Sequence, residues 1–320
     1  MKQSRKLMLF SVGVGVALVF LLLMVSASQL RAGGGDQAKK STPAPKVDPS
    51  QYLGAETCKG CHEEIYKKFE PTPHWKTTLG KVSGIEAHGC ESCHGPGADH
   101  VSGGGDKSKI FIFKNATSKR ISERCLECHQ YGEEHSNYAR SVHKTNDVSC
   151  TDCHSVHNAK EAQFLLAKSQ PQLCFSCHQD VKPEFNKPFR HRVNENLVKC
   201  TDCHNPHGGF LTKQVRATAA QDAVCFKCHA EKAGPFVFEH APVKTEGCVA
   251  CHTPHGSTNP RLLKRSQVNL LCLECHTPSA GPVEGAPAAP AFHNQAQKYQ
   301  ACTMCHVQIQ GSNFDRFFFK

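Results

Sequence analysis

Long hydrophobic runs are almost absent from this sequence. Only 39% of its 320 residues are hydrophobic, and its mean hydropathy is −0.44. Outside the first 30 residues the apolar stretches are short, and no alternating apolar pattern is long enough to predict a β-sheet. A chain of this composition cannot build an ordinary core from its own side chains, so we expect another apolar group to supply most of the interior.

Methionine is also scarce, and no cysteine stands outside a motif. The four methionines are Met1, Met8, Met24 and Met304. All 20 cysteines belong to ten C-x-x-C-H motifs, which leaves none for a disulfide, a catalytic thiol or a lipid anchor. The motif cysteines are Cys58, Cys61, Cys90, Cys93, Cys125, Cys128, Cys150, Cys153, Cys174, Cys177, Cys200, Cys203, Cys225, Cys228, Cys248, Cys251, Cys272, Cys275, Cys302 and Cys305. The histidines that follow them are His62, His94, His129, His154, His178, His204, His229, His252, His276 and His306.

This motif predicts covalently bound haem. Its two thiols form thioether links to the haem vinyl groups, and the adjacent histidine ligates the iron. A zinc-ribbon array also uses C-x-x-C pairs, but zinc does not require a histidine directly after every second cysteine. We therefore predict ten c-type haems whose macrocycles form the core. The predicted fold is mostly irregular with short α-helices, such as one over 63–69, in an elongated molecule with its haems in a chain.

The motifs alternate in kind, which predicts a repeat of about 50 residues that carries two haems. One class continues as C-x-x-C-H-x-x-H, and the other has Phe or Leu after its first cysteine. About five such units occupy residues 51–312. The first class begins at Cys150, Cys200 and Cys248, and the second at Cys125, Cys174, Cys225 and Cys272.

Eleven histidines lie outside the motifs, and ten are needed if every iron has two histidine ligands. Some precede a motif by seven to nine residues, namely His143, His191, His240 and His293, and His74 takes this place in the first unit. Others are the second histidine of C-x-x-C-H-x-x-H, namely His157, His207 and His255. This second histidine cannot easily reach the far face of its own haem, so we expect it to ligate a neighbouring one. His88 and His135 are off this pattern.

The last unit departs from the repeat. Counted from His306, the position equivalent to His255 is Ile309. Met304 lies inside a motif loop and cannot replace the missing ligand. We expect the tenth distal ligand to come from an off-pattern histidine, or to be absent, which would leave an open iron near His306.

The N-terminal 32 residues predict export from the cytoplasm. Residues 1–6 are basic, residues 7–25 are apolar, and small residues follow at 26–28. This pattern is typical of a cleaved signal peptide, with an uncleaved single-span anchor as the alternative. Residues 33–50 are expected to form a flexible linker, and residues 279–291 a surface loop.

A formal net charge of +10 would permit nucleic-acid binding. Haem propionates carry negative charge, however, and the lysines are better explained as their partners. We expect no nucleic-acid partner.

The segment 225–257, together with "CTDCHNPHG" at 200–208, resembles the decahaem periplasmic cytochromes of the MtrA/DmsE/PioA type. The resemblance covers residues 51–313 and all ten motifs. It implies a wire of bis-histidine haems inside an outer-membrane β-barrel partner, with periplasmic and extracellular cytochromes as redox partners. It also implies a location in the periplasm, associated with the outer membrane.

Carried over by position, the resemblance makes His74, His100, His143, His157, His191, His207, His240 and His255 distal ligands. Family members keep an H-G-S-N-H segment after the tenth motif, where this chain has "IQGSNF". Ile309 and Phe314 then replace the ligands, and His293 is the candidate to compensate.

We expect an electron carrier with no small-molecule substrate. The alternatives are a soluble periplasmic electron store and a multihaem reductase with an open terminal haem. Residues 313–320 form an aromatic tail, expected to be a packed or disordered end, with a docking plug as the alternative.

Overall fold

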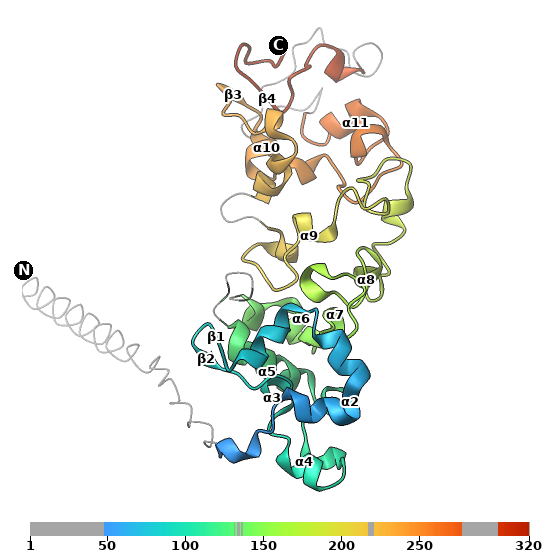
Figure 1. Ribbon diagram of the computed structural model, residues 1–320. Helices are drawn as coiled ribbons and strands as arrows, with labels where there is room; N and C mark the ends of the chain where they lie inside the picture. Colours follow the sequence, from blue (N-terminus) through green and yellow to red (C-terminus); the bar gives the residue numbers. More distant parts are fainter. Residues whose placement is uncertain are drawn as a thin grey trace, which may run out of the picture. The chain divides into compact units, whose positions relative to one another are not determined.

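The computed structural model describes residues 48–130, 132, 135, 137–216, 221–276 and 300–319 (Figure 1). The chain divides into two compact units, Met1–Asp48 and Pro49–Lys320. The predicted signal peptide or anchor, residues 33–47 of the linker, the loop at 279–291 and His293 lie outside the described residues. Among those described, no helix has both the length and the apolar character needed to cross a membrane.

Short helices joined by irregular chain make up the second unit, as the sequence predicts (Figure 1). The α-helices are α2 (Ala55–Phe69), α3 (Glu91–His94), α4 (Ala98–Ser102), α5 (Ser118–His129), α6 (Val142–Thr145), α7 (Cys150–Cys153), α8 (Gln172–Phe175), α9 (Cys200–Cys203), α10 (Ala241–Thr245) and α11 (Val268–Cys272). The 3₁₀ turns are η1 (Pro49–Gln51), η2 (Pro73–Leu79), η3 (Lys107–Lys109), η4 (Phe113–Asn115), η6 (Tyr138–Arg140), η7 (Gln163–Leu165), η8 (Glu184–Asn186), η9 (Thr212–Gln214), η10 (Gln221–Lys227), η11 (Ala230–Lys232), η12 (Cys248–Ala250), η13 (Pro260–Leu262) and η14 (Cys302–Met304).

Strands are few and very short. In the described chain, β1 (Lys81–Val82) pairs antiparallel with β2 (Ile85–Glu86), and β3 (Phe238–Glu239) pairs antiparallel with β4 (Gly311–Ser312). The lack of a larger sheet agrees with the lack of alternating apolar runs in the sequence.

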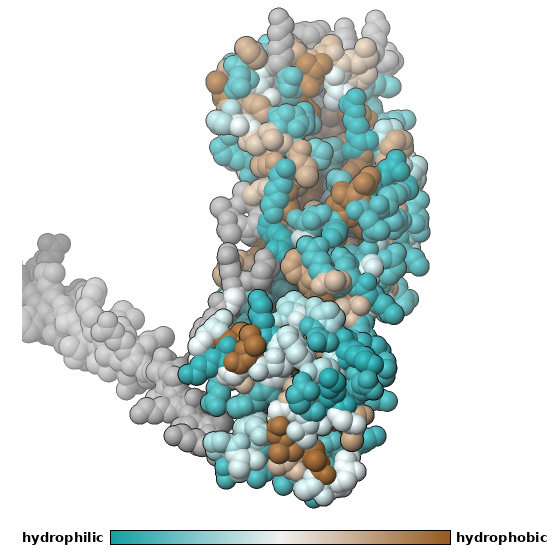
Figure 2. All heavy atoms as spheres, viewed as in Figure 1, coloured by the Kyte–Doolittle hydropathy of each residue, from teal (hydrophilic) through white to brown (hydrophobic). Residues whose placement is uncertain are grey.

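Small apolar clusters form where two or three elements meet. In α2, Tyr66 and Phe69 are buried, and both rings lie edge-on to Trp75 of η2, with centroids 5.2 and 5.8 Å away. Thr117 begins α5 by accepting a hydrogen bond from Arg120 N, and this helix buries Ile121. Large apolar side chains elsewhere stay exposed, and Figure 2 shows hydrophobic side chains as small separate groups on the visible face.

One local structure recurs after three motifs of the C-x-x-C-H-x-x-H class. In these return loops, at 155–167, 205–216 and 253–264, the chain turns back and pairs with its own motif. Arg216 N donates to Cys203 O at 2.7 Å, and Lys264 N donates to Cys251 O at 3.0 Å. Each return passes through two consecutive left-handed residues, for example Lys213 (φ 56°) and Gln214 (φ 53°). Non-glycine residues adopt this conformation only where surrounding contacts impose it.

Candidate haem sites

Each motif closes one helical turn. The backbone N–H of the motif histidine donates to the carbonyl of the first cysteine, at 2.9 Å from His204 to Cys200 and at 3.0 Å from His252 to Cys248. Positions i, i+3 and i+4 lie on one face of such a turn. The turn therefore places two sulfurs and one imidazole on the same side, as attachment of one haem requires.

Carboxylates fix the start of several of these turns by accepting backbone hydrogen bonds. Asp152 of α7 accepts a hydrogen bond from Ser149 N at 2.6 Å, and Asp202 of α9 accepts one from Lys199 N at 2.7 Å. Near the N-terminus, the buried Glu91 of α3 accepts from Leu53 N and Gly54 N. It thereby joins the start of the first motif helix to the second motif.

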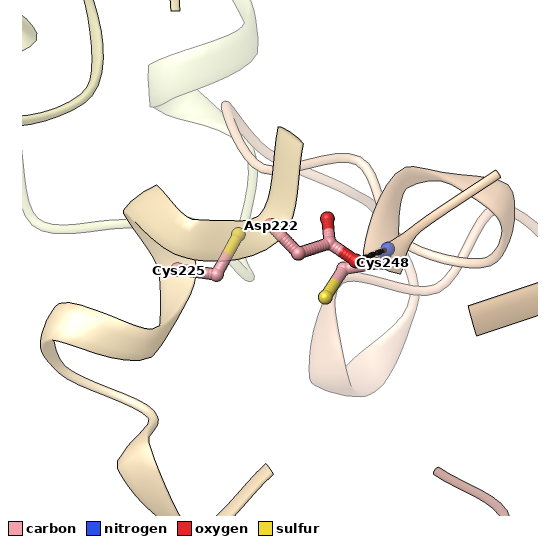
Figure 3. Close-up of side chains that lie close together, drawn as sticks. All are labelled: Asp222, Cys225 and Cys248. Carbon is pink, nitrogen blue, oxygen red and sulfur yellow. Dashed lines mark hydrogen bonds between the residues drawn. The ribbon is translucent and has the colours of Figure 1, made fainter. Parts of the chain in front are cut away.

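The motif at 248–252 has no aspartate of its own, and Asp222 takes that role. Asp222 lies with Cys225 and Cys248 in a group whose ligand atoms are all within 4.8 Å of one another (Figure 3). Its Oδ2 accepts from Cys248 N at 2.8 Å. Gly247 (φ 79°) makes room, because a Cβ there would lie 2.6 Å from Asp222 Oδ1. We interpret this group as the meeting point of two motifs, since both sulfurs belong to C-x-x-C-H.

The first cysteines of consecutive motifs lie together in five places. In four of these pairs, the hydrogen bond between the two sulfurs raises the pKa of one thiol. In the fifth pair, burial and then the charge of Cys302 raise the pKa of Cys272 to about 12. The pairs are Cys58–Cys90, Cys125–Cys150, Cys174–Cys200, Cys225–Cys248 and Cys272–Cys302.

The remaining neighbours approach through other cysteines. Burial, followed by the charge of Cys128, raises the pKa of Cys93. Burial is again the main cause of the raised pKa values of Cys153, Cys203 and Cys251. The charge of Cys177 adds to the effect at Cys153, those of Cys225 and Cys228 at Cys203, and that of Cys275 at Cys251. Because these charge interactions alternate with the first-cysteine pairs, each motif interacts with the next one along the chain.

The proximal histidines, those of the motifs, are oriented through Nδ1. A carbonyl can only accept, so each ring donates from Nδ1 and keeps Nε2 for a metal. Five rings of this kind donate to a carbonyl: His94 to Phe111 O (2.9 Å), His154 to Phe164 O (2.7 Å), His204 to Lys213 O (2.9 Å), His252 to Arg261 O (2.7 Å) and His306 to Phe317 O (2.5 Å). Three of these acceptors belong to the return loops, and Phe317 of the predicted aromatic tail is a fourth.

Eight proximal histidines face a second imidazole from elsewhere in the chain. Two histidines on opposite sides of one metal, each bound at about 2 Å, place their ring centroids roughly 6 Å apart. The pairs are His62–His100 (6.4 Å), His94–His157 (6.3 Å), His129–His74 (5.8 Å), His154–His207 (6.0 Å), His178–His143 (6.0 Å), His204–His255 (6.1 Å), His229–His191 (6.4 Å) and His276–His240 (6.1 Å). The residues therefore fit haem iron with two axial ligands.

Seven of these eight pairs follow a simple rule, and His62–His100 is the exception. The second histidine of C-x-x-C-H-x-x-H faces the proximal histidine two motifs earlier, as His255 faces His204. A histidine that precedes one motif faces the proximal histidine of the next motif along the chain. His191, for example, precedes the motif at 200–204 and faces His229 of the motif at 225–229. His157, His207 and His255 thus each face a motif histidine other than their own, and their ligation of a neighbouring haem stays a prediction.

Some of the distal histidines, those opposite the motif histidines, are also oriented through Nδ1. His143 Nδ1 donates to Pro206 O at 2.8 Å, and His191 Nδ1 donates to Pro254 O at 2.6 Å. His255 Nδ1 donates instead to the carboxylate of Glu184 at 2.8 Å. Burial lowers the pKa of His74, His157 and His240, which favours the neutral form that binds metal.

The off-pattern histidines lie near the first motifs. His88 stacks on Tyr52, with ring centroids 3.8 Å apart. His135 lies 5.5 Å from His129 and 4.7 Å from His207. The residues in these three ring contacts all lie outside the last unit.

Sequence comparison supports covalent haem attachment at these motifs. A doubled CXXCH motif family matches residues 143–183, 191–234 and 240–281, and the cytochrome c554 and c-prime family matches residues 104–155. "Multiheme cytochrome MtrA" of Shewanella baltica is 34% identical over 271 residues, which are 81% of this chain and 79% of that protein. The chain belongs to the MtrA-type multihaem cytochromes. It is an electron carrier that binds c-type haem covalently.

Two further likenesses are weaker. "High-molecular-weight cytochrome c" of Nitratidesulfovibrio vulgaris is 24% identical over 79% of this chain, which spans half of that protein. The undecaheme cytochrome from the S-layer of Carboxydothermus ferrireducens has 20% identity and a TM-score of 0.14, over 78% of this chain and 36% of that one. A TM-score this low carries no argument about the fold.

Sequence reasoning missed the residues that orient the histidines. Glu184 lies 71 residues from His255, and no motif marks it. The sequence does show two H-x-P-H segments. The carbonyl of Pro206 in one accepts from His143, and the carbonyl of Pro254 in the other accepts from His191. The return-loop carbonyls carry no sequence signal, because their role depends on backbone conformation alone.

Proposed function

We propose that this MtrA-type cytochrome binds ten haems and conducts electrons across the outer membrane within a β-barrel partner. The support is the unbroken succession of neighbouring motif cysteines from Cys58 to Cys302. Haem supplies a one-electron iron centre at each motif when bound. A conductor needs such centres close together without a gap.

The chain's own residues do the positioning. The cysteines would fix each macrocycle, and the motif histidines together with eight further histidines would hold the iron. Two imidazoles on one iron exclude small molecules from it, which suits transfer of electrons without substrate chemistry. Histidine in place of methionine on the distal side favours low potentials, because methionine ligation raises them.

The family likeness also supports a proposal for location and partners. The predicted export segment and the MtrA likeness support a periplasmic protein associated with the outer membrane. Periplasmic cytochromes at one end and extracellular cytochromes at the other are the proposed redox partners.

The test is transfer across a sealed membrane. Holoprotein is incorporated into vesicles with the β-barrel protein of its own assembly, a reduced dye is enclosed, and a ferric chelate is added outside. Dye oxidation is expected only when both proteins are present, and it should drop sharply when Cys200 and Cys203 are both replaced by alanine. No oxidation in the complete system contradicts the conduit, and oxidation of dissolved dye alone would favour a periplasmic electron store.

A further inference from the structure

The last unit of the chain should serve the motif at 248–252. His157, His207 and His255 each face the proximal histidine two motifs earlier. By the same step, the segment after His306 faces His252. On this rule, the histidine that the last unit lacks would serve the eighth haem site, whereas counting from the motif assigned the loss to the site at His306.

The strand register identifies the residue that replaces this histidine. Ser257 pairs with Phe189, two residues before His191, and His255 lies two residues before Ser257. In the last unit Ser312 pairs with Phe238, two residues before His240. The residue two before Ser312 is Gln310.

Counting from the motif had pointed to Ile309 instead. The last unit has one more residue between its motif histidine and the Gly-Ser pair than the unit at 252–257 has. The register therefore corrects Ile309 to Gln310, a partly buried residue.

His252 is prepared for iron on its own side. Its Nδ1 donates to Arg261 O at 2.7 Å, as His204 donates to Lys213 O. Opposite His204 lies His255, but among the described residues no imidazole has a ring contact with His252. A glutamine amide is a far weaker iron ligand than imidazole, since its oxygen is a hard donor.

We propose that His252 and Gln310 frame a ligand-binding position: His252 holds the iron from one side, and Gln310 leaves the other side to a small neutral diatomic molecule. This inference rests on haem attachment at Cys248 and Cys251, as proposed above. The Gln310 amide adds a hydrogen-bond donor beside the ligand. The chain then combines electron conduction with one site of exchangeable ligation.

The probe is carbon monoxide, titrated into dithionite-reduced, full-length holoprotein. The wild type is expected to bind it, and Gln310→His should bind one equivalent less with the haem content unchanged. The matched control Gln308→His, two residues away on the same segment, should bind as the wild type does. A wild type that binds no carbon monoxide, or a Gln310→His variant that binds as much as the wild type, overturns the inference.

Two further variants keep the test decisive if Gln310→His fails to mature. Gln310→Leu should retain carbon monoxide and shift the C–O stretching band upward, because the amide donor is lost; an unchanged band counts against Gln310. His293→Ala tests the alternative that His293 supplies the missing ligand. If the wild type is inert and His293→Ala gains one equivalent of carbon monoxide, the inference fails. Inert protein with ten haems leaves the conduit intact, whereas a haem content below ten contradicts the proposed function itself.

Discussion

The motifs at 200–204 and 248–252 have nearly identical near sides and different far sides. Both close one turn, both are followed by a return loop, and both histidines donate from Nδ1 to a loop carbonyl. Opposite them, His204 meets His255, whereas among the described residues no imidazole has a ring contact with His252, and Gln310 is the residue that we propose there. The near side is built from residues next to the motif, and the far side comes from about 50 residues downstream. The two halves can therefore change independently.

The anchoring of the two turns shows the same division. Asp202 is part of its own motif and accepts from Lys199 N. In the later motif valine and alanine stand between the cysteines, and the carboxylate comes from Asp222 of the preceding motif segment. The earlier turn is locally complete, and the later one depends on its neighbour.

Removal of a haem should have the largest effect on this comparison. Replacing Cys200 and Cys203 by alanine removes one attachment site, and Cys248 with Cys251 gives the matched variant. Loss of a bound metal group costs about 4–5 kcal/mol or more of the free energy of unfolding. Haem content by pyridine haemochrome should fall by one haem per chain in each variant. An unchanged content would show that these cysteines do not hold haem.

His255→Ala should convert the site at His204 into a copy of the site at His252. With its second imidazole gone, the reduced holoprotein is expected to bind one more equivalent of carbon monoxide than the wild type. His88→Ala is the control, because His88 stacks on Tyr52 rather than facing a motif histidine. Equal binding by wild type and His255→Ala would mean that His255 is not a ligand.

Asp222→Ala should destabilise the holoprotein more than Asp202→Ala. Asp222 is buried, and its removal leaves Cys248 N without an acceptor, at a cost of about 1–3 kcal/mol in the free energy of unfolding. Asp202 is exposed, so water can replace its carboxylate. Thermal unfolding followed by circular dichroism compares the two, and an equal shift in Tm would refute the difference in anchoring.

Glu184→Gln should have the smallest effect, on the potential of one haem. The carboxylate that accepts from His255 Nδ1 makes this imidazole a stronger donor and favours ferric iron. Its loss should raise one reduction potential by about 60 mV, which corresponds to a tenfold change in the equilibrium. Spectroelectrochemical titration measures this shift. Glu70→Gln, which removes an exposed carboxylate at the end of α2, should leave all potentials in place.

The tail illustrates how far sequence reasoning reached. Residues 313–320 were expected to be a packed or disordered end, with docking as the alternative. In the structure Phe317 O accepts from His306 Nδ1, and the ring of Phe319 lies 5.0 Å from that of His306. The tail thus contacts its motif as the return loops do, although its aromatic sequence does not resemble theirs.

The sequence by itself determined the haem chemistry, the short helices and the two-haem repeat, because the C-x-x-C-H turn is local and covalent attachment needs only neighbouring residues. It also predicted the helix over 63–69, where apolar side chains meet at helical spacing. Only the tertiary structure decided which distal histidine faces which motif, that Glu184 and the loop carbonyls orient the rings, and that Gln310 rather than Ile309 aligns with His255. Those relations join residues dozens of positions apart, which local sequence patterns do not reveal. The one extra residue after His306 also shifts the position obtained by counting from the motif, whereas backbone pairing fixes the register directly.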